Sequence, residues 1–281
     1  GFHAARVFAA NGADVTMACR SVDRGEEAAD EIRDEVDDAS VEVRELDLAS
    51  LESVRGFASD FADDHDALDV LCNNAGVMAI PRRETEDGFE QQFGVNHLGH
   101  FALTAHLSDL LVSTEGARVV TTSSGAHERG SIDFEDLHGE DEYTKWGAYA
   151  QSKLANLLFA FELQRRFDGA GVDAKSVGVH PGYADTDLQR RGPEMEGSRL
   201  KLGVMKAMNV VLAQSAERGS LPILYGATAE VESGEYVGPG GFMNMRGYPT
   251  VQEPNDSARD EETARRLWEV SKELTGVEFE L

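Results

Sequence analysis

Hydrophobic and polar positions along the chain follow two alternating patterns. Short apolar runs rich in β-branched residues predict buried parallel strands at 13–19, 41–46, 68–72, 117–122 and 172–179. Longer stretches with apolar residues at helical spacing predict helices at 24–36, 51–63, 86–113 and 149–167. This alternation indicates an α/β fold with a doubly wound parallel sheet of the Rossmann type, in which right-handed crossovers place helices on both faces.

The domain organisation is simple. No linker rich in proline or serine, no repeat and no low-complexity tract divides the chain, so we expect a single domain over residues 1–281. A long irregular segment is expected at 183–203, after the last predicted strand, and an acidic helix at 258–275.

The beginning of the chain departs from this pattern. Gly1 leads directly into an amphipathic helix, FHAARVFAANG, which Gly12 ends. A doubly wound sheet of this type needs a first strand and a loop before that helix. We therefore expect about 10 to 20 residues to be missing before Gly1, the length of one strand and a tight turn. The rival interpretation, a natural start at a processed glycine, would leave the centre of the sheet unfilled.

Composition narrows the possible partners. The 52 acidic and 26 basic residues give a formal net charge of -26, which would repel a nucleic acid. No apolar run approaches the length of a membrane span, and no signal segment is evident at the amino end. Cys19 and Cys72 lie in strand-like apolar runs and are interpreted as buried thiols of a cytoplasmic protein rather than a disulfide or a metal site.

The charge also suggests an environment. Among the 26 basic residues arginine greatly outnumbers lysine, and the acidic excess is typical of a protein adapted to concentrated salt. Near 1 M salt the Debye length falls to about 3 Å, so the repulsion between acidic groups is screened. The alternative is an acidic protein without that adaptation.

The candidate chemistry lies where predicted strands end. Tyr149 and Lys153 are separated by four positions and therefore project from one face of a helix. Ser123-Ser124 follows the strand at 117–122, and Asn73 to Gly76 ends another strand in the same way. Ligands meet an open α/β sheet at the carboxyl ends of its strands. Asn96, in the long predicted helix, is a residue with low helix propensity.

These segments, in this order, resemble the short-chain dehydrogenase/reductase family over nearly the whole chain. The matching residues are Asn73-Asn74-Ala75-Gly76, Asn96, Ser124, Tyr149 with Lys153, and His180-Pro181-Gly182 followed by Thr186. The stretches SSGAHERGSIDFEDLHGEDEY and AYAQSKLANLLFAFEL resemble most closely the branch that includes retinol dehydrogenases and light-dependent protochlorophyllide reductases. Gly1 resembles the last glycine of the family's TGxxxGxG loop.

The resemblance implies catalytic roles for four residues. Tyr149 would be the general acid that protonates the developing alkoxide as hydride arrives from a nicotinamide. Lys153 would lower the pKa of that phenol and hydrogen-bond the nicotinamide ribose. Ser124 would hold the substrate oxygen, and Asn96 would support a water-linked proton path. The alternatives are an ordinary half-buried Tyr149 and a helix-capping Ser124.

Cofactor choice is indicated at Arg20, which closes the strand at 13–19. An arginine at this point of a dinucleotide fold accommodates the 2'-phosphate of NADP, whereas an acid favours NAD. Asp47 matches the family's adenine contact, although it could instead cap the following helix. The resemblance places the remaining cofactor contacts at Gly1, Asn74, Ala75, Gly76, Tyr149, Lys153, Pro181, Gly182 and Thr186.

The resulting hypothesis is an NADP-dependent oxidoreductase that transfers hydride between a nicotinamide and a small carbonyl or alcohol, with 183–203 as its substrate loop. A non-enzymatic NADP-binding sensor and a light-dependent reductase of a ring double bond are the alternatives. The resemblance also suggests a homodimer or homotetramer formed through the two long helices. His97 and His100 lack a third ligand nearby in sequence and are interpreted as helix residues, so no metal is expected.

If the charge of -26 is an adaptation to salt, lowering the salt should unfold the protein although no ligand is removed. The acidic groups repel one another once the Debye length reaches about 10 Å. The melting temperature, followed by circular dichroism from about 3 M to about 0.1 M potassium chloride, should fall steeply through the range in which screening is lost. A melting temperature that does not depend on salt would contradict the adaptation.

Overall fold

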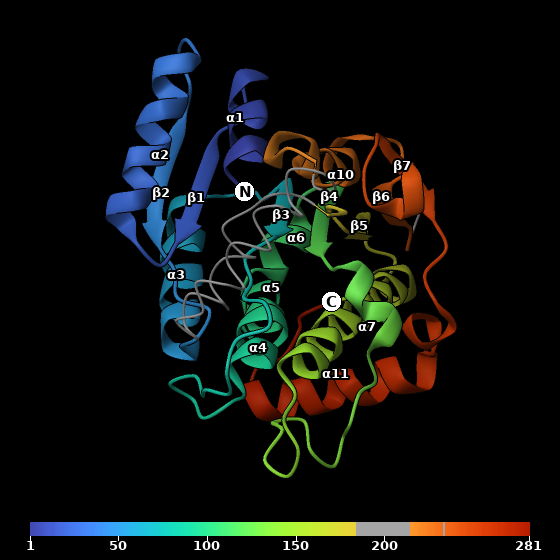
Figure 1. The fold of residues 1–281 in the computed structure, drawn as a ribbon. Helices are drawn as coiled ribbons and strands as arrows, with labels where there is room; N and C mark the ends of the chain where they lie inside the picture. The colour runs from blue at the N-terminus through green and yellow to red at the C-terminus, as the bar shows by residue number, and fades with distance from the viewer. Residues whose placement is uncertain (184–213, 233) are drawn as a thin grey trace.

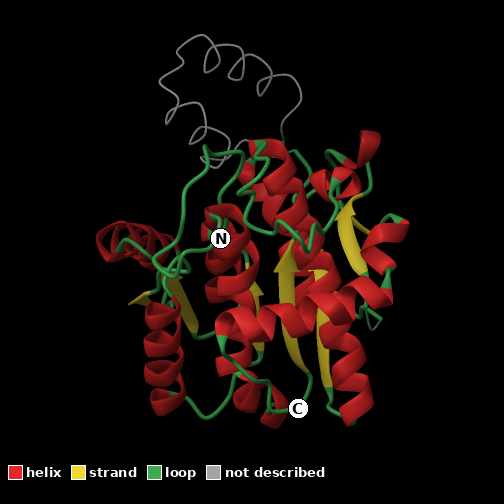
Figure 2. Cartoon of the chain, turned by 90° about the horizontal axis from the view of Figure 1, so that it is seen from below, coloured by secondary structure: helices red, strands yellow, loops and turns green. Residues whose placement is uncertain are grey.

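The structure, a computed structural model, describes residues 1–183, 214–232 and 234–281. Strands lie between helices that cover both faces (Figures 1 and 2). The strands in these ranges are β1 (Val15–Cys19), β2 (Val41–Glu45), β3 (Val70–Asn73), β4 (Ala117–Thr122), β5 (Ala174–Val179), β6 (Tyr236–Pro239) and β7 (Pro249–Gln252). The main helices are α1 (Phe2–Ala10), α2 (Val22–Glu35), α3 (Leu51–Asp64), α5 (Gly99–His106), α6 (Ser108–Ser113), α7 (Lys145–Ala170), α10 (Ala216–Thr228) and α11 (Glu261–Thr275).

The predicted α/β fold is confirmed, with two differences in the sheet. Among the described strands, β1 pairs with β2, and a second ladder runs in the order β3-β4-β5-β6-β7. Every pair is parallel except β6 with β7, which is antiparallel. The expected parallel sheet is therefore interrupted between β1 and β3 and carries one antiparallel strand at its edge. The periodicity did not predict β6 and β7, because each has only four residues and β7 is largely exposed.

The core is divided by the alternation of side chains along the strands. On β4, Val120 contacts the cluster formed with Ile223 of α10, whereas the neighbouring Val119 belongs to the cluster of α3, α5 and α7. Successive side chains of a strand point to opposite faces, so one buried apolar strand supports a helical layer on each side. The central strands are thereby fixed between two layers, and their carboxyl ends stay at one edge.

The long helix predicted at 86–113 is broken into several pieces. A short turn, α4 (Gln91–Phe93), leads into the π-helical segment η1 (Gly94–Leu98), followed by α5 and α6, which are separated at Leu107. A Cβ atom on Gly99 would lie 2.5 Å from the Leu48 carbonyl oxygen, so this helix approaches the segment after β2 more closely than another residue would allow. The π-helical turn contains Asn96, and such turns often accompany functional sites.

The last helix, α11, packs across α7 (Figure 1). It begins at Glu261 rather than at the expected 258, because Asp260 caps it by accepting a hydrogen bond from the Thr263 amide at 2.6 Å. Trp268 of α11 packs against Phe101 of α5 and Phe159 of α7, with ring centroids 5.1 and 5.8 Å apart. The C-terminal helix thus closes the apolar core on the side where α5 and α7 meet.

Candidate active site

The candidate site lies at the carboxyl ends of three adjacent parallel strands. The segment from Asn74 to Gly76 follows β3, Ser123-Ser124 follows β4, and His180-Pro181-Gly182 follows β5. Because the strands are neighbours in the order β3-β4-β5 and run parallel, their carboxyl ends share one edge of the sheet. The structure therefore brings together the segments that the sequence predicted from strand ends.

Helix α7 is fastened to the end of β4 by three hydrogen bonds. The Lys153 ammonium and the Asn156 amide both donate to the Thr122 carbonyl oxygen, at 3.1 and 2.9 Å. In return the Ser123 hydroxyl donates to the Lys153 carbonyl oxygen at 2.7 Å. All of these side chains are buried, and hydrogen bonds are strengthened where water is excluded. The position of the helix along the strand is fixed by these contacts.

Tyr149 and Lys153 are both buried at this junction, with 4% and 3% of their surfaces exposed. The Lys153 Nζ lies 5.9 Å from the centre of the Tyr149 ring. Burial raises the pKa of Tyr149, and a hydrogen bond with the Ser124 side chain acts in the opposite direction. Burial also lowers the pKa of Lys153 to about 8.

These directions correct one expectation from the sequence. Lys153 was expected to lower the pKa of Tyr149, yet in this structure the pKa is raised, and the opposing influence comes from Ser124. The reason is that removal from water disfavours both charged forms, phenolate and ammonium. The ammonium meanwhile donates to the Thr122 carbonyl oxygen.

Ser124 caps a helix, which is the alternative role that the sequence left open. Its hydroxyl accepts a hydrogen bond from the Ala126 amide at 3.2 Å at the start of the 3-10 helix η2 (Gly125–Arg129). The same side chain lies close enough to Tyr149 to lower the pKa of the phenol. Capping therefore limits the positions that the Ser124 hydroxyl can take beside Tyr149.

Asn96 is fully committed to contacts within the protein. Its Oδ1 accepts from the Val77 amide at 2.7 Å, and its Nδ2 donates to the Val77 carbonyl oxygen and the Ser152 hydroxyl, both at 2.9 Å. The Ser152 hydroxyl in turn donates to the Tyr149 carbonyl oxygen at 2.8 Å. The side chain thus connects the segment after β3 to the turn of α7 that carries Tyr149.

Two glycines allow close contacts at this edge. A Cβ atom on Gly76 would lie 2.9 Å from Asn96 Oδ1 and 3.6 Å from Lys153 Nζ. Gly182 has a φ of +65°, and a Cβ there would lie 2.4 Å from the Met245 carbonyl oxygen. The backbone at Gly76 therefore lies next to a buried ammonium that has N–H donors to spare after its bond to Thr122. These residues fit the family's nicotinamide cofactor.

The remaining predicted contacts are distributed around this edge. Arg20 is exposed directly after β1, and a Cβ atom on Gly1 would lie 3.2 Å from Asn74 Nδ2.

The capping alternative for Asp47 is wrong, because Ser50 is the N-cap of α3. Asp47 Oδ1 instead accepts a hydrogen bond from the Ala49 amide at 3.0 Å. Thr186 and residues 184–203 of the predicted substrate loop lie outside the described residues.

Several residues of the site were missed by the sequence reasoning. Ser152 and Asn156 follow Tyr149 by three and seven positions, which places them on the same face of α7. That spacing was a usable signal for both. Thr122 was not predictable in the same way, since it contributes through its carbonyl oxygen, an atom that every residue carries.

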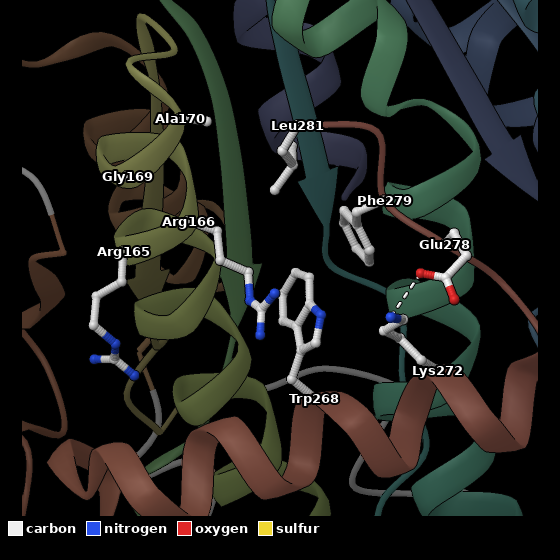
Figure 3. A pocket seen from close by; sticks show the side chains of 9 residues that line it. All are labelled: Arg165, Arg166, Gly169, Ala170, Trp268, Lys272, Glu278, Phe279 and Leu281. Carbon is white, nitrogen blue, oxygen red and sulfur yellow. Dashed lines mark ion pairs between the residues drawn. The ribbon is translucent and has the colours of Figure 1, made fainter.

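A separate cavity of about 480 Å³ lies between the last turns of α7 and α11 (Figure 3). Its cationic groups already have partners. Arg165 and Arg166 both contact Glu162, and Lys272 contacts Glu278 at 2.6 Å. The Arg166 guanidinium also lies over the Trp268 ring, 4.2 Å from its centre. The cationic groups of this cavity are therefore already paired with acidic side chains, and the cavity lies apart from the edge of the sheet that carries Tyr149.

The two helix histidines lie in the core. His97 Nε2 is 2.8 Å from the Ser271 hydroxyl, and His100 Nδ1 donates to the Asn96 carbonyl oxygen at 3.0 Å. Burial lowers the pKa of both imidazoles, to about 3 for His97 and about 4 for His100. Within the described ranges, no group of three or more His, Cys, Asp or Glu side chains is arranged to bind a metal ion. No helix in those ranges has the length and apolar character to span a membrane.

Comparison with known proteins identifies close similarities. The family model described as short chain dehydrogenase matches residues 1–197. Human retinol dehydrogenase 13 is 42% identical over 282 residues, covering 99% of this chain and 82% of that protein. Mouse polyprenol dehydrogenase is 42% identical over 281 residues, covering 98% of this chain and 80% of that protein.

Solved structures agree with these similarities. The crystal structure of an uncharacterized protein from Mycobacterium paratuberculosis is 41% identical and superimposes with a TM-score of 0.81, covering 100% of this chain and 91% of that one. A short chain dehydrogenase from Shigella flexneri in complex with NADP has a TM-score of 0.61 at 20% identity, covering 83% and 89% of the two chains. The second likeness supports the fold alone.

Replacing Lys153 with methionine should stabilise the cofactor-free protein at neutral pH. The folded-state pKa of about 8 lies below the ordinary value of 10.5, so the protonated lysine costs stability below pH 8. That cost, up to about 3 kcal/mol, disappears as the pH rises through the window between the two values. Urea denaturation of both proteins at several pH values measures the difference, which should vanish in strong alkali.

The matched control is Lys175→Met. Lys175 is only half-buried and donates to the Val231 carbonyl oxygen at 2.8 Å, so its loss should not stabilise the protein. Equal stabilisation by the two substitutions would show that burial of the Lys153 charge is not the cause.

Proposed function

The chain belongs to the short-chain dehydrogenase/reductase family and is an oxidoreductase that acts on CH–OH and C=O groups, and on this premise we propose that it uses Tyr149 as general acid–base and NADP(H) as hydride carrier. The observation that carries the proposal is the arrangement of Tyr149, Ser124 and Lys153. The Ser124 side chain acts on Tyr149 by lowering the pKa of the phenol, and the hydrogen bonds between α7 and the end of β4 hold both residues at the carboxyl edge of the sheet.

In the reductive direction, Tyr149 donates its phenolic proton to the carbonyl oxygen of the substrate. A bound nicotinamide supplies or accepts the hydride. The Ser124 hydroxyl, positioned by its contact with the Ala126 amide, holds the same substrate oxygen. A carbonyl oxygen gains negative charge as it is reduced, so two hydroxyl donors aimed at it stabilise the transition state more than the ground state.

Lys153 contributes a positive charge and spare N–H donors. Its buried ammonium lies near Gly76, at the carboxyl edge of the sheet where we propose that the nicotinamide ribose binds. Hydrogen bonds from an ammonium to a sugar hydroxyl orient the nucleotide. Asn96 has a positioning role, because its side chain connects α7 to the segment after β3. We also propose the water-linked proton path that the family resemblance implies for Asn96.

The choice of NADP(H) rests on Arg20. It is exposed immediately after β1, at the end of the strand where a dinucleotide fold meets the adenosine ribose. A guanidinium there can form charge-assisted hydrogen bonds with a 2'-phosphate. An acidic residue, which would select the 2'-hydroxyl of NAD, is absent at that position.

The substrate we propose is an apolar alcohol or aldehyde. Trp146, in the first turn of α7, keeps 55% of its surface exposed, and its ring meets that of Tyr149 edge to face with centroids 6.0 Å apart. An exposed indole next to the proton donor provides an apolar contact surface for a substrate. Retinol and polyprenol, which appear in the names of the relatives, are alcohols of this kind.

Tyr149→Phe keeps the ring and removes the phenolic hydroxyl that donates the proton. We expect cofactor binding to be retained and kcat to fall by about 10² to 10⁴, the usual range for general acid–base catalysis. Binding is measured by quenching of protein fluorescence and turnover by NADPH oxidation. Tyr248→Phe, at a tyrosine that is 75% exposed, is the control and should leave both unchanged. Activity of Tyr149→Phe within threefold of the parent would remove Tyr149 from the mechanism.

Arg20→Asp should shift the preference from NADPH toward NADH. The substitution removes a charge-assisted contact worth about 1.5 to 3 kcal/mol and adds repulsion of the 2'-phosphate. The ratio of kcat/KM for the two cofactors is the measurement. Arg218→Asp, which makes the same charge change at an exposed position of α10, should leave the ratio as it is. If Arg20→Asp also leaves it fixed, the phosphate is bound elsewhere.

The activity itself is tested by a screen of NADPH oxidation in molar potassium chloride. The substrates are retinal, an isoprenoid aldehyde and a small polar aldehyde, and the assay runs in the dark. Turnover of the apolar aldehydes supports the proposal. Turnover only in light would favour the ring double-bond reductase, and NADPH binding without turnover of any carbonyl would favour the sensor.

A further inference from the structure

Three buried aromatic rings lie between the segment that holds Ser124 and the segment Pro181-Gly182. They belong to His127 in η2, His180 directly after β5, and Tyr236 at the start of β6, a strand that pairs with β5 (Figure 1). The Tyr236 ring meets His127 edge to face, with centroids 5.4 Å apart, and stacks on His180 at 5.2 Å. The three side chains form a continuous ring stack from one segment to the other.

At one end of the stack, His127 holds the backbone of Ser124. Its ring Nδ1 lies 2.7 Å from the Ser124 carbonyl oxygen, and its main-chain amide donates to the same oxygen at 3.0 Å. A carbonyl oxygen only accepts, so Nδ1 carries the hydrogen. The position of the His127 imidazole therefore constrains the position of the Ser124 backbone.

At the other end, His180 holds the backbone of Gly182. Its Nδ1 accepts from the Gly182 amide at 3.3 Å, and its Nε2 donates to Gln252 Oε1 at 3.0 Å, so the two partners select one tautomer. The ring fits against Gly238, where a Cβ atom would lie only 1.8 Å from Nε2. The imidazole has no room to shift toward β6.

The three rings contact each other without hydrogen bonds between them. His127 Nε2 and the Tyr236 hydroxyl are buried, and neither has a hydrogen-bond partner among the described residues. Buried polar atoms without partners are unfavourable. At His127 the imidazole is nevertheless needed for its Nδ1, because phenylalanine or leucine could not hydrogen-bond the Ser124 carbonyl oxygen.

We propose that the ring stack of His127, Tyr236 and His180 is a positioning device that keeps the Ser124 hydroxyl in register with the Pro181-Gly182 backbone. The inference rests on the proposed function, which gives Ser124 the substrate oxygen and Pro181-Gly182 the nicotinamide. A displacement of one segment relative to the other separates the groups that must meet for hydride transfer, and such errors reduce kcat strongly. The three residues act through the backbone and touch neither substrate nor cofactor.

The kinetic test compares Tyr236→Leu with Tyr236→Phe. Loss of the ring should lower kcat about tenfold at saturating NADPH, whereas phenylalanine preserves the ring contacts and should restore most of the rate. Phe167→Leu, in the core at the far end of α7, is the control for lost stability. If it lowers kcat as much as Tyr236→Leu at an equal fall in melting temperature, the stack is merely structural and the proposal is overturned.

A second measurement does not depend on turnover. Hydrogen exchange followed by mass spectrometry should show that His127→Leu speeds exchange at Gly182 as well as near Ser124, because the stack transmits the change. Faster exchange confined to residues 123–130 would overturn the proposal. If the wild-type protein reduces no carbonyl, the proposed function fails, yet the exchange result still decides whether the two segments are coupled through the stack.

Discussion

The attachment of α7 to the end of β4 is the constraint on which the candidate site depends. Lys153 and Asn156 donate to the Thr122 carbonyl oxygen while Ser123 donates back to the helix, and all three side chains are buried. Each bond by itself is modest, but a buried polar group without a partner is expensive, so the helix has little freedom to slide along the strand. Tyr149 is placed by this attachment, and the clamp formed by Asn96 and Ser152 gives it a second support.

The same burial that fixes the site also opposes its chemistry. Removal from water raises the pKa of Tyr149 and lowers that of Lys153, so burial destabilises the charged form of each side chain before any ligand arrives. Hydrogen bonds made by a bound nucleotide and substrate can reverse this preference at the moment when charge develops. Catalytic sites commonly hold groups with shifted pKa values. A pKa that suits the reaction requires an environment different from water, in which each group would keep its ordinary value.

The sequence predicted the features that depend on local pattern. The α/β class, β4 at 117–122 and the pairing of Tyr149 with Lys153 on one helix face follow from periodicity, and the structure places them as expected. Features that depend on tertiary contact were missed. Asn96, in the π-helical turn η1, hydrogen-bonds the backbone of Val77, and no periodicity in the sequence reports that contact. Tyr236 gave no signal either, because its role comes from rings that belong to other elements.

The packing of α11 has a consequence for assembly. Trp268 packs against both Phe101 and Phe159, on the side where the short helix α5 meets the long helix α7. The dimer or tetramer that the resemblance suggests through those helices stays a prediction. Helix α11 covers Phe101 and Phe159 within the same chain, so the burial of these two side chains does not require a second copy.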